Sequence, residues 1–230
     1  MNILAFMAHK EDAALLCAGT LMKYQAQGHE IYIAVATGSE VPWGAEEMGA
    51  QVRLLGFEPA GLQDNMTTRA AALTAIRWAN ADIILTHAPW DGDGDHAIAG
   101  KLMADSLLIV GGKLHPADLP PIKKLPHLFY TDTLAGNALQ NRYTLRNYRT
   151  TDQTFYLTPG VHSNDWFEPE AYVDISDYSR QKFAMIPDTA LREGLQAQSR
   201  IRGVQMGCRQ AEAFTGHRIV GHIADYRLLP

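Results

Sequence analysis

The sequence has few cysteines, no excess of positive charge and no apolar leader with a charged flank. Its two cysteines, Cys17 and Cys208, are too few for a disulfide framework and are expected to be buried thiols in helical segments of a reducing compartment. Basic residues number 20 and acidic residues 25, which argues against a nucleic-acid partner and against an anionic membrane surface. The apolar start, Met1 to Met7, is too short to span a bilayer or to act as a signal sequence. We therefore expect a cytoplasmic protein with no nucleic-acid or membrane partner.

The 230 residues suffice for one large domain with a full core, and we expect a single domain over residues 1–230. In the first half, short apolar runs alternate with helical patterns. Strands are expected at Asn2–Met7, Ile31–Ala36 and Asp82–Thr86, and helices at Asp12–Gln27, Ala45–Leu55, Thr68–Trp78 and Asp95–Leu107. This alternation is typical of βαβ units and predicts an α/β fold, with a Rossmann-like, mostly parallel sheet and helices on both faces.

The second half is less regular. A strand is expected at His127–Thr131, and residues 134–170 have too weak a periodicity for any element to be assigned. A helical region is expected over Asp174–Met185, and a long helix over Thr189–Phe214, with interruptions near Gly203 and Gly207. This half can also supply a subunit contact, so a homo-oligomer is an open alternative.

Two loops that follow predicted strands carry side chains that bind metals. In open α/β sheets, ligands bind outside the carboxyl ends of the strands. His9-Lys10-Glu11-Asp12 follows the first strand directly, and the loop after the third strand leads into Asp95-His96. Together, His9, Asp12 and His96 would form a set of two histidines and one carboxylate. Such a set suits zinc and leaves a fourth position open for water, as in catalytic zinc sites.

Each of these residues also has an ordinary structural explanation. Asp12 alone would be an N-cap or first-turn acid, and His96 alone a first-turn histidine. The interleaved acids Asp91, Asp93 and Asp95 resemble a calcium loop, but the glutamate that should follow is missing. A dinucleotide-binding oxidoreductase is disfavoured because no Gly-x-Gly-x-x-Gly follows the first strand. The presence of both clusters at one predicted sheet edge favours the metal site.

The motifs resemble those of a known family. Ala8-His9-Lys10-Glu11-Asp12, followed by Cys17-Ala18-Gly19-Thr20-Leu21, is similar to the opening motif of the LmbE-like, PIG-L-type N-acetylglucosaminyl deacetylases. Asp95-His96 resembles the end of that family's second motif, and weaker likenesses extend over nearly the whole chain. The resemblance implies an LmbE-like fold, with zinc bound by His9, Asp12 and His96 and with Glu11 as the general base. The implied reaction removes an acetyl or acyl group from the amide nitrogen of an amino sugar or a related small molecule.

The chain departs from the family pattern next to the implied metal. Glu11 stands where the family has aspartate, Lys10 where it has proline, and Asp93 where it has a histidine that stabilises the oxyanion. A carboxylate at position 93 would repel the negative charge that develops on the reacting carbonyl. His87, His162 and Lys10 are alternative oxyanion donors, and the sequence does not rank them.

Three residues are predicted to lie on the substrate side of the site. Asp64 falls where family members carry an acid that can contact sugar hydroxyls, and Asp93 occupies the altered histidine position. Trp90 lies on a loop beside the site and can stack on a sugar ring, although a half-buried loop tryptophan explains it equally well. An N-acyl amino sugar or its conjugate is the implied small-molecule partner. The alternative is a metal-containing binding or regulatory relative that has little or no hydrolytic activity.

Overall fold

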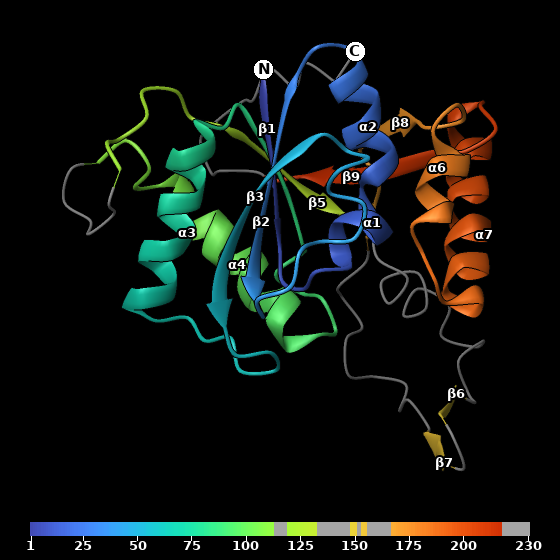
Figure 1. Ribbon diagram of the computed structural model, residues 1–230, viewed down its shortest axis with the longest axis horizontal. Helices are drawn as coiled ribbons and strands as arrows, with labels where there is room; N and C mark the ends of the chain where they lie inside the picture. The colour runs from blue at the N-terminus through green and yellow to red at the C-terminus, as the bar shows by residue number, and fades with distance from the viewer. Residues whose placement is uncertain (113–118, 133–147, 151–152, 156–166, 218–230) are drawn as a thin grey trace.

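The computed structural model describes residues 1–112, 119–132, 148–150, 153–155 and 167–217 (Figure 1). Within these residues, one sheet contains seven strands in the order β3-β2-β1-β4-β5-β9-β8. The strands are β1 (Asn2–Met7), β2 (Glu30–Thr37), β3 (Ala50–Phe57), β4 (Ile83–Thr86), β5 (His127–Thr131), β8 (Ala171–Asp174) and β9 (Ala211–Gly216). A separate antiparallel pair is formed by β6 (Tyr148–Thr150) and β7 (Gln153–Phe155). The helices are α1 (Asp12–Leu16), α2 (Ala18–Ala26), α3 (Met66–Ala79), α4 (Gly94–Leu107), α6 (Ser179–Ala184) and α7 (Thr189–Met206).

The sheet is mostly parallel. Strands β3, β2, β1, β4 and β5 run in one direction, and β9 and β8 add an antiparallel edge. Strand β1 pairs with β2 on one side and with β4 on the other, so the order of the strands reverses at this point. The loops after β1 and β4 therefore leave the sheet side by side, where open α/β sheets bind their ligands. The predicted α/β fold with a mostly parallel sheet is confirmed.

Helices cover both faces of the sheet, as predicted (Figure 1). Helices α3 and α4 pack on one face, and α1 and α2 on the other, with α6 and α7 beside β8 and β9. The apolar run of β1 serves both layers, because successive side chains of a strand point to opposite faces. Leu4 and Phe6 enter one core, Ile3, Ala5 and Met7 the other, and none of them is more than 1% exposed.

The prediction of a helix over Ala45–Leu55 is wrong. The chain turns at Gly49, which has a φ of 60°, and continues as strand β3 over Ala50–Phe57. Strand β3 is the edge strand beside β2, and most of its residues are only partly buried. An edge strand of this kind lacks a strict alternation of apolar and polar residues, which made its pattern readable as a helix.

Three other helix predictions need correction. The helix expected over Asp12–Gln27 is broken at Cys17, so α1 and α2 are separate. The region expected to be helical from Asp174 begins with the end of strand β8, and α6 starts only at Ser179. The long helix expected to reach Phe214 ends at Met206, where Gly207 adopts a φ of 87° as the helix cap. Beyond it, pairing with β5 and β8 makes β9 a strand despite its helix-favouring alanines and glutamate.

Other predictions agree with the structure only in part or are not tested by it. Cys17 and Cys208 are free thiols: Cys17 is buried, as predicted, at the break between α1 and α2, whereas Cys208 follows α7 and is only partly buried. In the described ranges, no helix combines the length and the apolar character needed to cross a bilayer. Most of residues 134–170 and His162 lie outside the described residues. The single-domain organisation, the cytoplasmic location and the homo-oligomer stay predictions.

Candidate metal centre

The loops after β1 and β4 bring His9, Asp12 and His96 together, as the sequence predicted. Nδ1 of His9 lies 3.2 Å from Nε2 of His96, and each of these nitrogens lies 3.5 Å from Oδ2 of Asp12. Donor atoms bound to one tetrahedral zinc at roughly 2.0–2.1 Å are about 3.3 Å from one another. The three donors are therefore already spaced for an ion of this size.

Local backbone structure sets these positions. Asp12 opens α1, where the positive end of the helix dipole favours a carboxylate, and it accepts a 2.7 Å hydrogen bond from the backbone N–H of His9. His96 lies in the first turn of α4, and Asp93 caps that helix. The carboxylate of Asp93 accepts hydrogen bonds from the N–H groups of Asp95 and His96, at 2.8 and 3.2 Å. Asp12 and His96 thus lie at the starts of α1 and α4, and the backbone N–H of His9 is bonded to Asp12.

A second carboxylate faces the outer nitrogen of each imidazole. Nε2 of His9 is 3.3 Å from Oδ2 of Asp95, and Nδ1 of His96 is 3.3 Å from Oδ2 of Asp91. Asp95 is buried and is itself held by the backbone N–H groups of Ala60 and Leu62, at 2.7 and 3.0 Å. Acidic partners of this kind orient metal-binding histidines and fix their tautomers. Sequence reasoning missed both roles, although the run of acids before His96 was the available signal.

His87 is fully buried, and its Nε2 lies 3.1 Å from Oδ2 of Asp12. Its Nε2 accepts a 3.0 Å hydrogen bond from the backbone N–H of Ala8, and its ring stacks on that of His96 with centroids 3.8 Å apart. Because it is buried, His87 is not placed to donate a hydrogen bond to a substrate. Of the other two oxyanion donors considered, Lys10 forms an ion pair with Glu40, and His162 lies outside the described residues.

The charges of the cluster favour a bound cation. Burial opposes ionisation of Asp12, but His87 and the neighbouring imidazoles hold the pKa of Asp12 well below its usual value. Burial also disfavours charge on His96, yet Asp12 and Asp91 raise the pKa of His96 to about 10. Burial lowers the pKa of His87, which favours the neutral form of that ring. A positive charge is therefore stabilised between the carboxylates, and a metal would displace a proton to bind there.

The remaining predicted site residues lie around this centre in different settings. Glu11 is the residue before α1, is partly exposed, and its side chain does not cap the helix. Trp90 is 37% exposed and packs edge-on against Tyr130, with ring centroids 5.2 Å apart. Asp64 lies before α3, where its carboxylate pairs with Arg69 and Lys101. These contacts place the residues but do not test their predicted roles toward a substrate.

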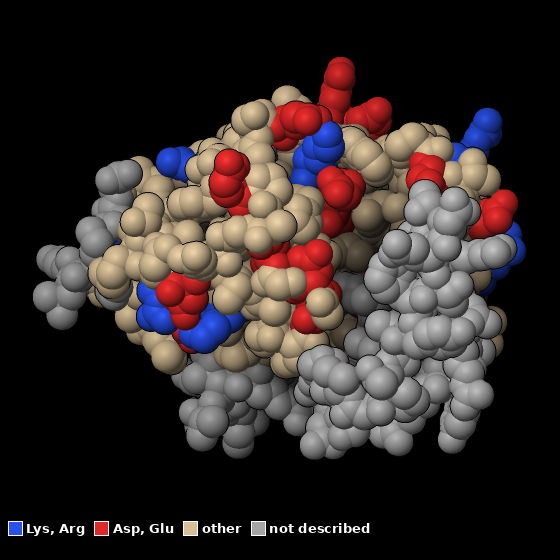
Figure 2. Space-filling view, turned by 90° about the horizontal axis from the view of Figure 1, so that it is seen from below, with Lys and Arg blue, Asp and Glu red and all other residues tan. Residues whose placement is uncertain are grey.

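Acidic side chains gather on the face of the molecule that holds this centre. Figure 2 looks onto this face from below, and carboxylates outnumber ammonium and guanidinium groups near its middle. Lys10, Arg69 and Lys101 each pair with a carboxylate in the described structure. The described part of this face therefore favours a neutral or cationic ligand over an anionic one.

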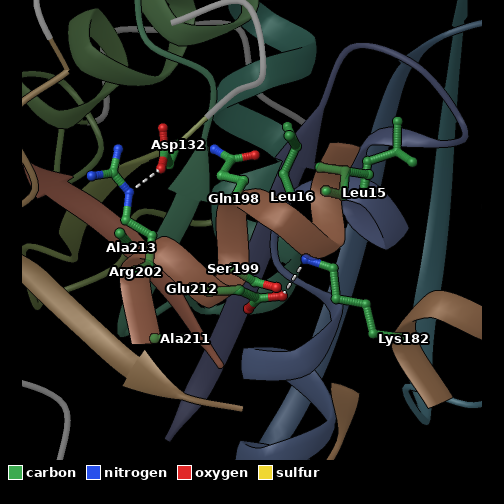
Figure 3. A pocket seen from close by; sticks show the side chains of 11 residues that line it. Leu15, Leu16, Asp132, Lys182, Gln198, Ser199, Arg202, Ala211, Glu212 and Ala213 are labelled. Atoms are coloured by element: carbon green, nitrogen blue, oxygen red, sulfur yellow. Dashed lines mark hydrogen bonds and ion pairs between the residues drawn. The ribbon is translucent and has the colours of Figure 1, made fainter. Parts of the chain in front are cut away.

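A small cavity lies elsewhere, between α1, α7 and β9 (Figure 3). Its volume is about 20 Å³, which is room for roughly one water molecule. Two buried ion pairs lie on its wall, Lys182 with Glu212 and Arg202 with Asp132, both at 2.6 Å. None of the residues of the metal centre lines this cavity, so it is not part of the centre.

No established protein-family model matches the sequence. Solved structures do share the fold. The 4-carboxy-2-hydroxymuconate hydratase of Pseudomonas putida superposes with a TM-score of 0.73 at 15% identity, over 97% of this chain and 100% of that one. A conserved protein of Thermus thermophilus gives 0.73 at 22% identity, over 99% of each chain. The N,N'-diacetylchitobiose deacetylase of Pyrococcus horikoshii gives 0.69 at 16% identity, over 98% of this chain and 87% of that one.

These identities establish the fold and not the reaction. The fold predicted from the motifs is that of the deacetylases, and the structural likeness confirms it. A hydratase has the same fold, so the reaction must be argued from the residues of this chain.

Proposed function

We propose that the protein is a zinc-dependent hydrolase that removes an acetyl or acyl group from the amide nitrogen of an amino sugar or a related small molecule. The observation that carries this proposal is the spacing of the donors in His9, Asp12 and His96, at 3.2 to 3.5 Å. Two imidazoles and one carboxylate are a donor set of catalytic zinc sites, in which a further position is left for water. Zinc bound there would polarise the amide carbonyl and lower the pKa of a water molecule.

Glu11 is proposed to move the proton in this reaction. It directly precedes the ligand Asp12 and is partly exposed, and its carboxylate forms no ion pair with the described residues. A carboxylate in this state can accept a proton from the attacking water and pass it to the leaving amine. Asp93 is already engaged in capping α4, which argues against its taking the same role.

The charge of the site supports an amide substrate. The hydratase named above acts, by its name, on a molecule with carboxylate groups, which calls for cationic side chains around the site. The described lysines and arginines of this face are instead paired with acids. An N-acyl sugar carries no such charge, and the deacetylase named above acts, by its name, on a diacetylated sugar. Asp64, Trp90 and Asp93 are proposed to lie beside this substrate.

Metal analysis and an acetate-release assay test the proposal together. The purified protein should contain, or take up, about one zinc ion per chain, and should release acetate from one or more members of a panel of N-acetyl sugars. The Glu11→Ala variant should retain its metal and lose roughly 10²–10⁴-fold in turnover. Glu193→Ala removes an exposed glutamate of α7 and is the matched control, for which no change is expected.

Three outcomes would contradict the proposal. A wild-type protein that neither contains metal nor takes up added zinc would remove its basis. If metal and sugar bind without release of acetate, and Glu11→Ala behaves like the parent, the protein is the non-hydrolytic binding relative. Water addition to an unsaturated acid, with no amide hydrolysis, would instead point to hydratase chemistry.

A further inference from the structure

We infer that Asp91 is a positioning residue that holds a proton on Nδ1 of His96 and thereby leaves Nε2 of His96 free to bind the metal. The inference rests on the proposed metal centre and assigns a role to a residue that does not belong to the donor triad. It starts from an unusual concentration of buried polar atoms without partners.

Three such atoms belong to one group. Nδ1 of His87, Oδ2 of Asp91 and Nδ1 of His96 are all buried, and none has a well-aligned hydrogen bond to any described residue. The same three residues offer donor atoms that lie within 4.8 Å of one another. His87 is fully buried, and the side chain of Asp91 is only 2% exposed. Because buried polar groups are nearly always paired, this group calls for an explanation.

The hydrogen bonds around the group show where its protons lie. Nε2 of His87 accepts the N–H of Ala8, so a neutral His87 carries its proton on Nδ1. His96 can present a lone pair at Nε2 to the donor triad only if its own proton is on Nδ1. The Nδ1 proton of His96 therefore lies on the side of its ring that faces Asp91.

Asp91 is placed to accept this proton. Its Oδ1 takes a 3.0 Å hydrogen bond from the backbone N–H of Asp93, which fixes the carboxylate against the loop. Its Oδ2 lies 3.3 Å from Nδ1 of His96. A small rotation of either group would align this contact into a hydrogen bond. An acceptor suits this position, because Nδ1 of His96 supplies the donor.

A second metal ion is a weaker explanation of the same three residues. The rings of His87 and His96 are nearly parallel, at 18°, with centroids 3.8 Å apart. The lone pairs of an imidazole lie in the plane of its ring, so two stacked rings do not direct theirs at a common point.

The test compares Asp91→Ala with Asp91→Asn. An amide oxygen can still accept the proton of Nδ1, whereas a methyl group cannot. Loss of such a partner typically weakens metal binding by roughly 10–100-fold. We expect zinc affinity, measured by competition with a chromophoric chelator, to fall by about this factor in Asp91→Ala, with most of it recovered in Asp91→Asn. Asp177→Ala, which removes an exposed acid, is the matched control and should bind zinc like the wild type.

Nitrogen-15 NMR of labelled histidines provides a readout that a general loss of stability would not imitate. A slowly exchanging, downfield Nδ1 proton of His96 is expected in the wild type and in Asp91→Asn, and it should be lost in Asp91→Ala. Equal zinc affinity and an unchanged resonance in Asp91→Ala would overturn the inference. So would two zinc ions per wild-type chain with one lost in Asp91→Ala, because that result assigns a second cation to the group.

The same measurements separate this inference from the proposed function. Wild-type protein that binds no zinc would contradict the function, while the ring-proton resonance of the metal-free protein would still decide the role of Asp91. Zinc binding without amide hydrolysis would contradict the hydrolase proposal. The zinc affinities and NMR spectra of the two Asp91 variants would still test the role of Asp91.

Discussion

Two clusters of buried charge in the described residues differ in one respect. In the Lys182–Glu212 cluster, the carboxylate of Glu212 already has its hydrogen-bond donors within the protein. The carboxylate of Glu212 receives Nζ of Lys182 at 2.6 Å and the N–H groups of Gly19 and Thr20 at 2.9 and 2.8 Å (Figure 3). In the histidine–aspartate cluster of His9, Asp12 and His96, three electron-pair donors face one another at 3.2 to 3.5 Å.

This difference separates a structural cluster from a binding one. A buried carboxylate surrounded by donors needs nothing more, and removing one partner leaves an uncompensated charge. Lone pairs that converge on one point repel one another unless a cation lies between them. The first cluster should therefore control stability, and the second should control metal binding. Variants of each cluster test this division.

The largest effect is expected for His96→Ala. Removing one of three ligands should weaken zinc binding by more than the roughly 10–100-fold that loss of an outer partner costs. Turnover should fall to background, while the circular dichroism spectrum stays that of the wild type. Metal content measured by mass spectrometry and acetate release check this result. A variant with wild-type metal content would exclude His96 as a ligand.

Lys182→Met should lower stability and leave zinc binding nearly unchanged, which is the opposite of the effect of His96→Ala. Glu212 would remain buried without its cation, and breaking a buried pair costs about 3–5 kcal/mol. Urea unfolding should show this loss in the free energy of unfolding, whereas zinc affinity of the folded protein should change little. The double variant Lys182→Met/Glu212→Gln should recover part of the loss. Unchanged stability with lost zinc binding would contradict the division between the clusters.

Gly100→Ala should affect both properties moderately. A Cβ at this position of α4 would overlap the carbonyl oxygen of His87 and lie 2.9 Å from the backbone nitrogen of Pro89. The loop that carries His87 would have to move, at a cost of about 1–3 kcal/mol in the free energy of unfolding. Zinc affinity should fall along with thermal stability. Gly111→Ala, where a Cβ meets only ordinary contacts, is the matched control.

The smallest effect is expected for Asp93→Asn. Asparagine caps helices about as well as aspartate, so the stability and zinc affinity of this variant should match those of the wild type. Asp93→Ala removes the cap and should cost about 1 kcal/mol in thermal unfolding. A raised KM in Asp93→Asn, with stability unchanged, would show instead that Asp93 contacts the substrate.

The sequence predicted the layout of the donors because each lies next to a strongly patterned element. The apolar run before His9 could only be a buried strand, and the capping acid Asp93 marks the start of the helix that bears His96. Ligands of parallel sheets gather at the carboxyl ends of the strands, so two such loops sufficed to predict that these side chains lie together.

The partners of the ligands could not be predicted in the same way. Asp91 and Asp95 were grouped as a weak calcium loop, because spacing alone does not show which imidazole nitrogen each acid faces. Strands β3 and β9 were assigned to helices for a related reason. Their strand character comes from pairing with neighbours distant in the sequence, and local residue preferences do not contain that information.

The hydrogen bond between Gly19 and Glu212 has a consequence for the order of assembly. It joins residues 193 positions apart, whereas all three metal-facing side chains lie within the first 96 residues. During synthesis the ligand-bearing strands and helices leave the ribosome well before the strand that fixes the start of α2. Contacts of such long sequence separation form slowly, so the nascent protein passes through a stage in which its proposed metal ligands are present but α2 is not yet anchored.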